Sequence, residues 1–320
     1  MPGIERHYMK RRLKSILNNI LNRDTNSFDD IKFMMGKSLC FAQKKLKPQK
    51  LSDVEFKVFS QWGEDGIIEF LLSNIPISNK FFVEFGVENY RESNTRFLMI
   101  NRNWSGLVID GSRENIEDIK RQKIYWQYDL HALNHFITKD NINEIIRNEL
   151  LKLKIDNNIG ILSIDIDGVD YWVLKEISVI NPSIVICEYN SLYGNQKPFT
   201  VPYDPEFSRS RYSHTNLYWG ANLKAFETLL KDKGYSYIGS NIQNLNAFFV
   251  KSDIATKYIP DLIVNSDDTF EYSKIRETRN SEGKLNYLRR EEQLNEISNL
   301  KLVDLEKNSN ILIEELISIT

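Results

Sequence analysis

The chain has 320 residues and a formal net charge of −2, which gives no general reason to expect nucleic acid as a partner. Hydrophobic residues make up 41% of the chain, enough to bury the core of a folded protein. With only Cys40 and Cys187, the composition argues against a disulfide framework and favours a reducing cytoplasm. No window approaches the roughly 20 apolar residues that a membrane-spanning helix needs, and no export signal is apparent.

Residues 1–50 are basic, and the spacing of their apolar residues predicts a helical extension. The apolar positions are Leu13, Ile16, Leu17, Ile20 and Leu21. Such a segment can contact an acidic membrane surface or nucleic acid, but we favour a solvated helix packed on the main domain. We place that domain at residues 51–255.

Three apolar segments each end at an acidic residue, as buried parallel strands do at the rim of a sheet. They are KFFVEFGV at residues 80–87, GLVIDGS at 106–112 and IGILSIDIDGVDYW at 159–172. In open α/β sheets, ligands bind outside the carboxyl ends of the strands. We therefore expect Glu84, Asp110 and Asp165 to share one site.

Further segments complete an alternating pattern. An edge strand is expected at residues 124–128, closed by Asp129, and another strand at 183–188 ends in Glu188. Helical spacing covers 141–154, 169–177 and 223–230, and an antiparallel pair is expected at 235–238 with 247–250. This layout predicts an α/β fold of the Rossmann-like class I methyltransferase type, with a mostly parallel seven-stranded sheet that ends in an antiparallel hairpin.

Two segments lie outside this pattern. Residues 190–216 contain three prolines and no periodicity, which is typical of a lid or an insertion. Residues 256–320 are charged and predict a helical C-terminal extension. Its heptad spacing suggests a homodimer through a short coiled coil, or packing against the chain's own domain. The heptad positions are Leu302, Leu305, Leu312, Leu316 and Ile319.

The residues after the first strand favour S-adenosylmethionine (SAM) over a dinucleotide. A pyrophosphate needs a glycine-rich turn, whereas here Gly86 is followed by Val87, Glu88 and other larger residues. SAM has no phosphate and carries a sulfonium cation, which carboxylates stabilise. Asp110 lies about two dozen residues further on, where it can accept hydrogen bonds from ribose hydroxyls.

Several motifs in this order resemble the FkbM-like SAM-dependent methyltransferases, in particular the branch found with bacterial surface-glycan genes. They are FSQWGEDG (59–66), FVEFG (82–86), ESNT (92–95), WSG (104–106), LSIDIDGVDYW (162–172) and EYN (188–190). The resemblance covers about residues 59–251. In place of the small residues that commonly follow the first glycine in that family, this chain has Glu88, Asn89 and Tyr90.

The resemblance implies a cofactor site in which Glu84 and Gly86 form the first SAM motif and Asp110 binds the ribose. Gln61, Asn94 and Thr95 are expected near the methionine portion, and Ser112 or Asp129 near the adenine. The full expected cofactor set is Gln61, Glu84, Gly86, Asn94, Thr95, Asp110, Gly111, Ser112, Asp129 and Asp165.

Methyl transfer to oxygen needs a base or a metal beside the methyl group, because the acceptor hydroxyl must lose its proton. Asp167 is the first candidate, and His214 is a second base that the 190–216 segment can deliver. Asp167, Glu188 and Asn190 are candidate ligands of Mg²⁺ or Ca²⁺, since they offer only oxygen atoms. An alternative interpretation of this trio is a hydrogen-bonded rim that orders loops.

Arg209 and Arg211 can hold a phosphate or carboxylate of the acceptor, although loop arginines are often only solvated. The leading hypothesis is an O-methyltransferase acting on a sugar or other small anionic acceptor, phosphorylated or nucleotide-linked. A metal-dependent glycosyltransferase that uses Asp165 and Asp167 is the rival enzyme. A non-catalytic binding module is the third interpretation.

Overall fold

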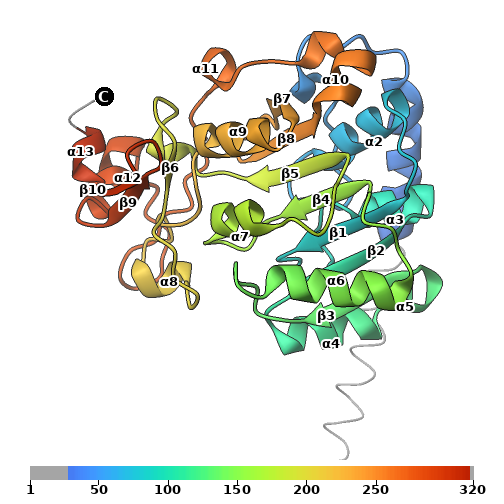
Figure 1. Cartoon of the computed structure of the whole chain (residues 1–320), viewed down its shortest axis with the longest axis horizontal. Coiled ribbons are helices and arrows are strands. Elements are labelled where there is room, and N and C mark those ends of the chain that lie inside the picture. The colour runs from blue at the N-terminus through green and yellow to red at the C-terminus, as the bar shows by residue number, and fades with distance from the viewer. Residues whose placement is uncertain (1–27, 318–320) are drawn as a thin grey trace, which may run out of the picture.

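The computed structural model describes residues 28–317, and a seven-stranded sheet organises most of them (Figure 1). The strand order is β3-β2-β1-β4-β5-β8-β7. The first five strands run parallel, and β8 runs antiparallel to both β5 and β7. This order confirms the predicted Rossmann-like class I methyltransferase fold. The strands are β1 (Phe81–Phe85), β2 (Ser105–Asp110), β3 (Leu130–Asn134), β4 (Ile161–Ile164), β5 (Ile184–Glu188), β7 (Tyr235–Ser240) and β8 (Asn246–Lys251).

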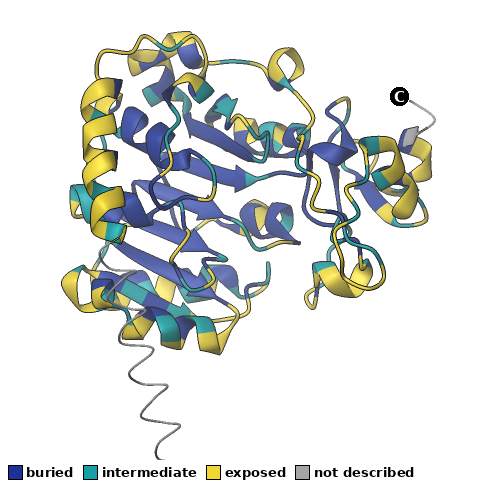
Figure 2. Cartoon of the chain, turned by 180° about the vertical axis from the view of Figure 1, so that it is seen from behind, coloured by how far each residue is buried: buried dark blue, intermediate teal, exposed yellow. Residues whose placement is uncertain are grey.

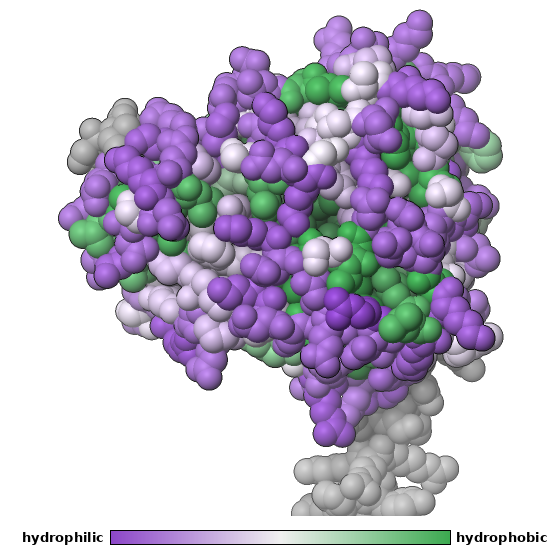
Figure 3. All heavy atoms as spheres, viewed as in Figure 1, coloured by the Kyte–Doolittle hydropathy of each residue, from purple (hydrophilic) through white to green (hydrophobic). Residues whose placement is uncertain are grey.

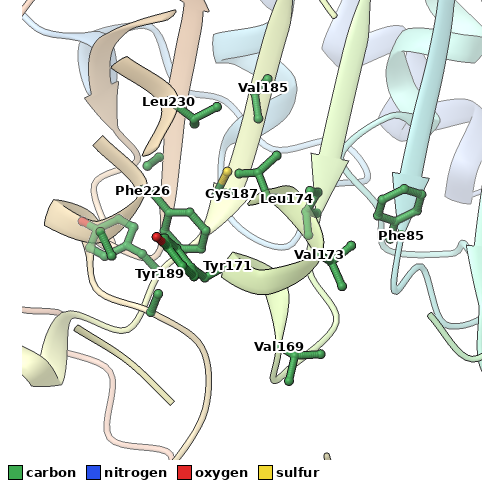
Figure 4. Close-up of a cluster of buried hydrophobic side chains, with 14 of the residues drawn as sticks. Phe85, Val169, Tyr171, Val173, Leu174, Val185, Cys187, Tyr189, Phe226 and Leu230 are labelled. Carbon is green, nitrogen blue, oxygen red and sulfur yellow. The ribbon is translucent and has the colours of Figure 1, made fainter. Parts of the chain in front are cut away.

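Helices cover both faces of the sheet, because alternate strand residues point to opposite sides. Phe81, Val83 and Phe85 of β1 belong to the core that includes α6 (Ile142–Leu153), α7 (Asp170–Glu176) and α9 (Leu223–Asp232). Figure 4 shows part of this core around Tyr171 and Phe226. Phe82 belongs to the opposite core. The helices there are α2 (Glu64–Asn74), α3 (Arg96–Arg102), α4 (Arg113–Arg121) and α10 (Ser252–Tyr258).

The edge strand differs from the sequence prediction. Residues of the segment expected as a strand form helix α5 (Lys123–Gln127), and the strand is the following segment, β3. The aromatic residues of α5 gave a misleading strand signal, since Trp126 is 73% exposed and packs in no strand. As a consequence, Asp129 precedes the edge strand and does not close it.

A second, three-stranded sheet has the order β10-β9-β6. It joins β6 (Phe199–Thr200), from the segment predicted as a lid or insertion, to β9 (Lys301–Asp304) and β10 (Ser309–Leu312). In Figure 1 the arrowheads of β1, β4 and β5 point toward this sheet. The second sheet therefore lies beyond the carboxyl ends of the central strands.

The predicted helical C-terminal extension is wrong over residues 301–312, because Leu302 and Leu312 lie in strands. The heptad positions cannot form a continuous coiled coil there, and Leu302 is fully buried in the protein's own core. Ile319 lies outside the described residues. The helical parts are short. They are α11 (Ser266–Thr269), α12 (Arg290–Glu296) and α13 (Glu314–Ile317), with the 3₁₀ turn η3 (Pro260–Leu262).

The described part of the N-terminal extension is helical at residues 28–43 and packs on the main domain. Gln43 is buried and donates to the carbonyls of Val54 and Gly66, both at 2.7 Å. Asp29 pairs with the buried Arg96 at 2.9 Å. The remaining helix surface is mostly exposed, whereas the strands are buried (Figure 2). The predicted apolar positions at 13–21 lie outside the described residues.

Among residues 28–317, no helix is both long and apolar enough to span a bilayer. The face in Figure 3 is mainly hydrophilic and carries scattered apolar patches.

Candidate active site

A cavity of about 970 Å³ opens at the carboxyl ends of the parallel strands. Glu84 at the end of β1, Asp110 at the end of β2, Asp165 after β4 and Glu188 at the end of β5 all line it. The expectation that these strand ends share one site is therefore confirmed. These four carboxyl groups and that of Asp167 form a set of five that we call the acidic wall.

Gly86 allows the loops after β1 and β4 to approach each other closely. Its φ is +70°, and a Cβ at this position would lie 1.5 Å from the carbonyl oxygen of Asp165. No side chain fits there. Because left-handed backbone is also costly for other residues, the structure requires glycine on two counts.

The loop after Gly86 uses its larger residues for packing and hydrogen bonding. Tyr90 is fully buried, and its hydroxyl lies 2.9 Å from Thr95 Oγ1. The backbone N–H of Glu88 donates to Asp110 at 2.8 Å. Both residues have positive φ, +47° and +61° for Glu88 and Tyr90. The loop is thus fixed by a buried tyrosine and by a backbone hydrogen bond to Asp110.

Glu84 braces the next loop. Its carboxylate accepts hydrogen bonds from Ser93 Oγ at 2.6 Å, Asn94 N at 2.9 Å and Thr95 N at 3.2 Å. Burial raises the pKa of this carboxyl group, and the hydrogen bonds counteract that rise. The expected contact of Thr95 with the methionine portion is wrong, because its side chain bonds to Glu84 and Tyr90 and does not line the cavity.

Asp110 is placed at the cavity with well-defined geometry. One oxygen accepts from Glu88 N, and the other accepts from Ser112 N at 2.8 Å and Asn115 Nδ2 at 3.2 Å. An ionised carboxylate has about four acceptor positions, so capacity for a ligand hydroxyl remains. Ser112 itself caps α4 through Asn115 N and does not line the cavity, which corrects its predicted contact with adenine.

The predicted contact of Asp129 with the cofactor is also wrong, and residues that the sequence analysis did not select line the cavity after β3. Asp129 precedes β3 and therefore lies at the amino end of this strand, whereas the cavity lies at the carboxyl ends. Its Oδ1 is 3.0 Å from His131 Nε2. The residues that follow β3 and line the cavity are His135, Phe136 and Ile137. Because β3 ends at residue 134, the residues that follow it lie at the carboxyl end of the sheet, where the cavity is.

Gln61, Asn94 and Gly111, which were predicted to contact the cofactor, line the cavity. Asn94 Nδ2 also donates to Ser163 Oγ at 3.1 Å. Trp62, which the sequence analysis did not select, lines the same cavity, and its indole Nε1 is buried with no hydrogen-bond partner among the described residues. Since buried N–H groups are nearly always bonded, this donor is available to a ligand.

The loop after β4 presents Asp167 to the cavity. Asp167 has φ +55°, and Asp170, at the start of α7, supports the turn by accepting from Ile166 N at 2.8 Å and Gly168 N at 2.9 Å. Backbone strain of this kind costs energy and persists only where the surroundings fix it. The side chain of Asp167 is 58% exposed and pairs with Arg209 Nη1.

Ligand oxygens of Asp165, Asp167 and Glu188 lie within 4.8 Å of one another, and we call these residues the acidic cluster. Burial, reinforced by repulsion between the carboxylates, raises the pKa of both Asp165 and Glu188 well above its usual range. Glu188 Oε2 is buried without a partner in the described part of the chain.

Asn190 lies at the cavity, but its side-chain amide is hydrogen-bonded to the protein backbone. Its Nδ2 donates to the carbonyls of Leu217 and Trp219, and its Oδ1 accepts from Leu192 N at 3.1 Å. The oxygen cluster that could hold a cation therefore contains Asp165 in its place, which corrects the predicted ligand set.

Two further predictions fail for the 190–216 segment. His214 is exposed and does not line the cavity, so it is not positioned as a base. Arg211 faces away and pairs with Asp204 at 2.6 Å and Glu206 at 3.6 Å. Arg209, by contrast, lies in the cavity between Asp167 and Glu277, whose Oε2 is 4.0 Å from Arg209 Nη2.

The C-terminal segment supplies a wall that the sequence analysis did not anticipate. Its cavity-lining residues include four cations, which we call the basic wall. They are Lys274, Arg276, Arg289 and Arg290. No periodicity marks these residues, and long-range contacts such as that of Ser273 with Ser191 and the pairing of β6 with β9 bring this part of the chain to the strand ends.

No protein-family model and no curated protein matches this chain. Among solved structures, the N-terminal domain of EvdMO1 with SAH bound is 11% identical, over 67% of this chain and 94% of that chain, at a TM-score of 0.37. A SAM-dependent methyltransferase from Clostridium acetobutylicum is 9% identical, over 65% of this chain and 94% of that chain, at a TM-score of 0.35. A putative O-methyltransferase from Klebsiella pneumoniae is 11% identical, over 53% of this chain and 71% of that chain, at a TM-score of 0.33.

Proposed function

We propose that this protein is a SAM-dependent O-methyltransferase whose acceptor is a hydroxyl of a sugar or another small anionic molecule, phosphorylated or nucleotide-linked. The observation that carries the proposal is the acidic wall at the carboxyl ends of the parallel strands, facing a cavity of about 970 Å³. The motif resemblance to FkbM-like methyltransferases supports it and suggests bacterial surface-glycan biosynthesis as the setting.

The charges in this part of the cavity match SAM and oppose a dinucleotide. Asp110 would accept the ribose hydroxyls, and the acidic cluster would stabilise the sulfonium cation. A diphosphate in the same place would lie among Glu84, Glu88 and Asp110, which repel it. Gln61, Asn94 and the unpaired indole N–H of Trp62 would bind the polar groups of the methionine portion.

Asp167 is the proposed base. The acceptor oxygen attacks the methyl carbon, the new O–CH₃ bond forms as the S–CH₃ bond breaks, and the sulfonium becomes a neutral thioether. The hydroxyl proton passes to the Asp167 carboxylate. Arg209, paired with Asp167, holds that carboxylate at the cavity.

A divalent cation held by Asp167 is the alternative to Asp167 as the base. Three carboxylates within 4.8 Å suit Mg²⁺ in donor type, and Asp165, Asp167 and Glu188 would hold it. When bound, the ion would make a coordinated hydroxyl more acidic. Turnover that falls with EDTA and returns with Mg²⁺ would support this role, and unchanged turnover would remove the ion from the mechanism.

Calorimetry of the full chain with SAM, S-adenosylhomocysteine, UDP-sugars and GDP-sugars tests the function. We expect both adenosyl compounds to bind, followed by methyl transfer in a screen of phosphorylated and nucleotide-linked sugars. Tight binding of a sugar nucleotide without SAM binding would favour the glycosyltransferase interpretation. Binding of neither class would favour a non-catalytic module.

A further inference from the structure

The cavity has two walls of opposite charge that come from different parts of the chain. The acidic wall belongs to the strand ends of the main sheet. The basic wall belongs to residues 274–290 of the C-terminal segment. Within residues 28–317, the ion pairs that reach this region join Arg209 to Asp167 and Glu277, and none involves a basic-wall cation.

The basic wall is held in place by contacts to both neighbouring elements. Ser273 N donates to Ser191 Oγ at 2.9 Å, which attaches the segment to the turn after β5. Glu277 lies 4.0 Å from Arg209 in α8 (Arg209–Tyr212). Leu294 of α12 is 1% exposed, so the helix that follows Arg289 is anchored in the core. The cations are therefore positioned and are not on a free tail.

Arg290 gives the strongest indication that a ligand binds at the basic wall. Its guanidinium lies 4.1 Å from the centre of the Tyr272 ring, which fixes its plane. Its Nε is buried and has no hydrogen-bond partner among the described residues. A buried guanidinium N–H without an acceptor is costly unless a ligand supplies one.

We infer that the basic wall is the binding site for the phosphoryl or diphosphate group of an anionic ligand. Four cations that pair with no carboxylate in the described part of the chain favour a group with more than one negative charge, which a single carboxylate does not provide. The planar donor pairs of three arginines also match phosphate oxygens. That this ligand is the methyl acceptor rests on the proposed function; the anion site itself does not.

Binding of inorganic pyrophosphate to the full chain tests the inference, with malonate as a dicarboxylate for comparison, all at constant ionic strength. The test variant is Arg276→Gln/Arg289→Gln, which removes two exposed cations and spares the packed Arg290. Its matched control, Lys301→Gln/Lys307→Gln, removes two charges from the same subdomain outside the cavity.

We expect the test variant to bind pyrophosphate at least about tenfold more weakly and the control to remain within about twofold of the wild type. Equal weakening in both variants, or wild-type binding that is absent or no tighter than that of malonate, would overturn the inference. S-adenosylhomocysteine affinity, measured in parallel, should be unchanged in both variants. Pyrophosphate binding without any S-adenosylhomocysteine binding would keep the anion site and reject the methyltransferase.

Discussion

The acidic and basic walls face one cavity but are built in different ways. Glu84 and Asp110 lie on buried strands, and backbone N–H groups of the adjoining loops fix their carboxylates. Arg276 and Arg289 lie on irregular, exposed backbone, and the wall is positioned by a few side-chain contacts such as that of Tyr272 with Arg290. Damage to the first wall should therefore affect folding and cofactor binding, whereas damage to the second should affect the other ligand alone.

The largest effect is expected from Gly86→Ala in the first wall. A Cβ would overlap the Asp165 carbonyl at 1.5 Å and the backbone would be strained, so we expect a loss of more than about 4 kcal/mol in the free energy of unfolding. Denaturant unfolding measures this. Gly111→Ala is the matched control in the same cavity: its Cβ would meet only Phe136, at 3.3 Å, and that side chain is 56% exposed and can move. Similar losses in both variants would contradict the rigid-wall description.

Asp167→Asn separates chemistry from binding within the acidic wall. Loss of the proposed base should lower turnover by about 100-fold or more, while S-adenosylhomocysteine affinity changes by less than about threefold. Asp204→Asn removes another carboxylate paired with a loop arginine, outside the cavity, and should keep normal turnover. Near-normal turnover of Asp167→Asn would reject the base.

Tyr272→Ala probes the second wall. Without the ring beneath Arg290, the KM for an anionic acceptor should rise by about five- to tenfold, with S-adenosylhomocysteine affinity unchanged. Steady-state kinetics gives the first value and calorimetry the second. Tyr258→Ala, which removes a ring that contacts Lys257 elsewhere on the surface, should change neither. Weakened cofactor binding in Tyr272→Ala would show that the two walls are not independent.

The smallest effect is a pH dependence confined to the sheet domain. Burial, with a smaller contribution from Glu64, raises the pKa of Glu55 from 4.5 to about 7. The stabilisation from the protonated form is complete below pH 4.5 and is lost as the pH rises through about 7.

Glu55→Gln should therefore gain about 1 to 2 kcal/mol over the wild type between about pH 5 and about pH 8, measured by urea unfolding. The amide oxygen of the substituted side chain would still accept the hydrogen bond that Ile242 N donates to Glu55. Glu92→Gln removes an exposed carboxylate and should show no such gain. A pH-independent difference between Glu55→Gln and the wild type would contradict the raised pKa.

The sequence predicted the sheet and its acidic strand ends because local patterns specify both. Apolar runs that stop at Glu84, Asp110 and Asp165 mark where parallel strands end, and parallel strands end together. The edge strand was misplaced because aromatic residues in α5 resemble a strand more than the sequence of β3 does. Because the strand was predicted too early in the chain, Asp129 was predicted to lie at the cavity in place of the residues that follow β3.

The remaining errors concern side chains whose partners are distant in sequence. Nothing near Asn190 indicates that the carbonyls of Leu217 and Trp219 occupy its amide, and nothing near Arg211 distinguishes it from Arg209. The basic wall was missed for the same reason. Its position depends on contacts with distant parts of the chain, such as those of Ser273 with Ser191 and of Glu277 with Arg209, which no local signal specifies.

The pairing of β6 with β9 also sets an order of assembly during synthesis. The seven-stranded sheet is complete once residue 251 has emerged from the ribosome, whereas Phe199 and Thr200 must wait for residues 303 and 304. Because chains tend to fold from the N-terminus as they are made, the nascent protein would form the proposed cofactor side of the cavity before the basic wall. On the proposed function, a chain released early would then bind SAM without being able to hold the acceptor.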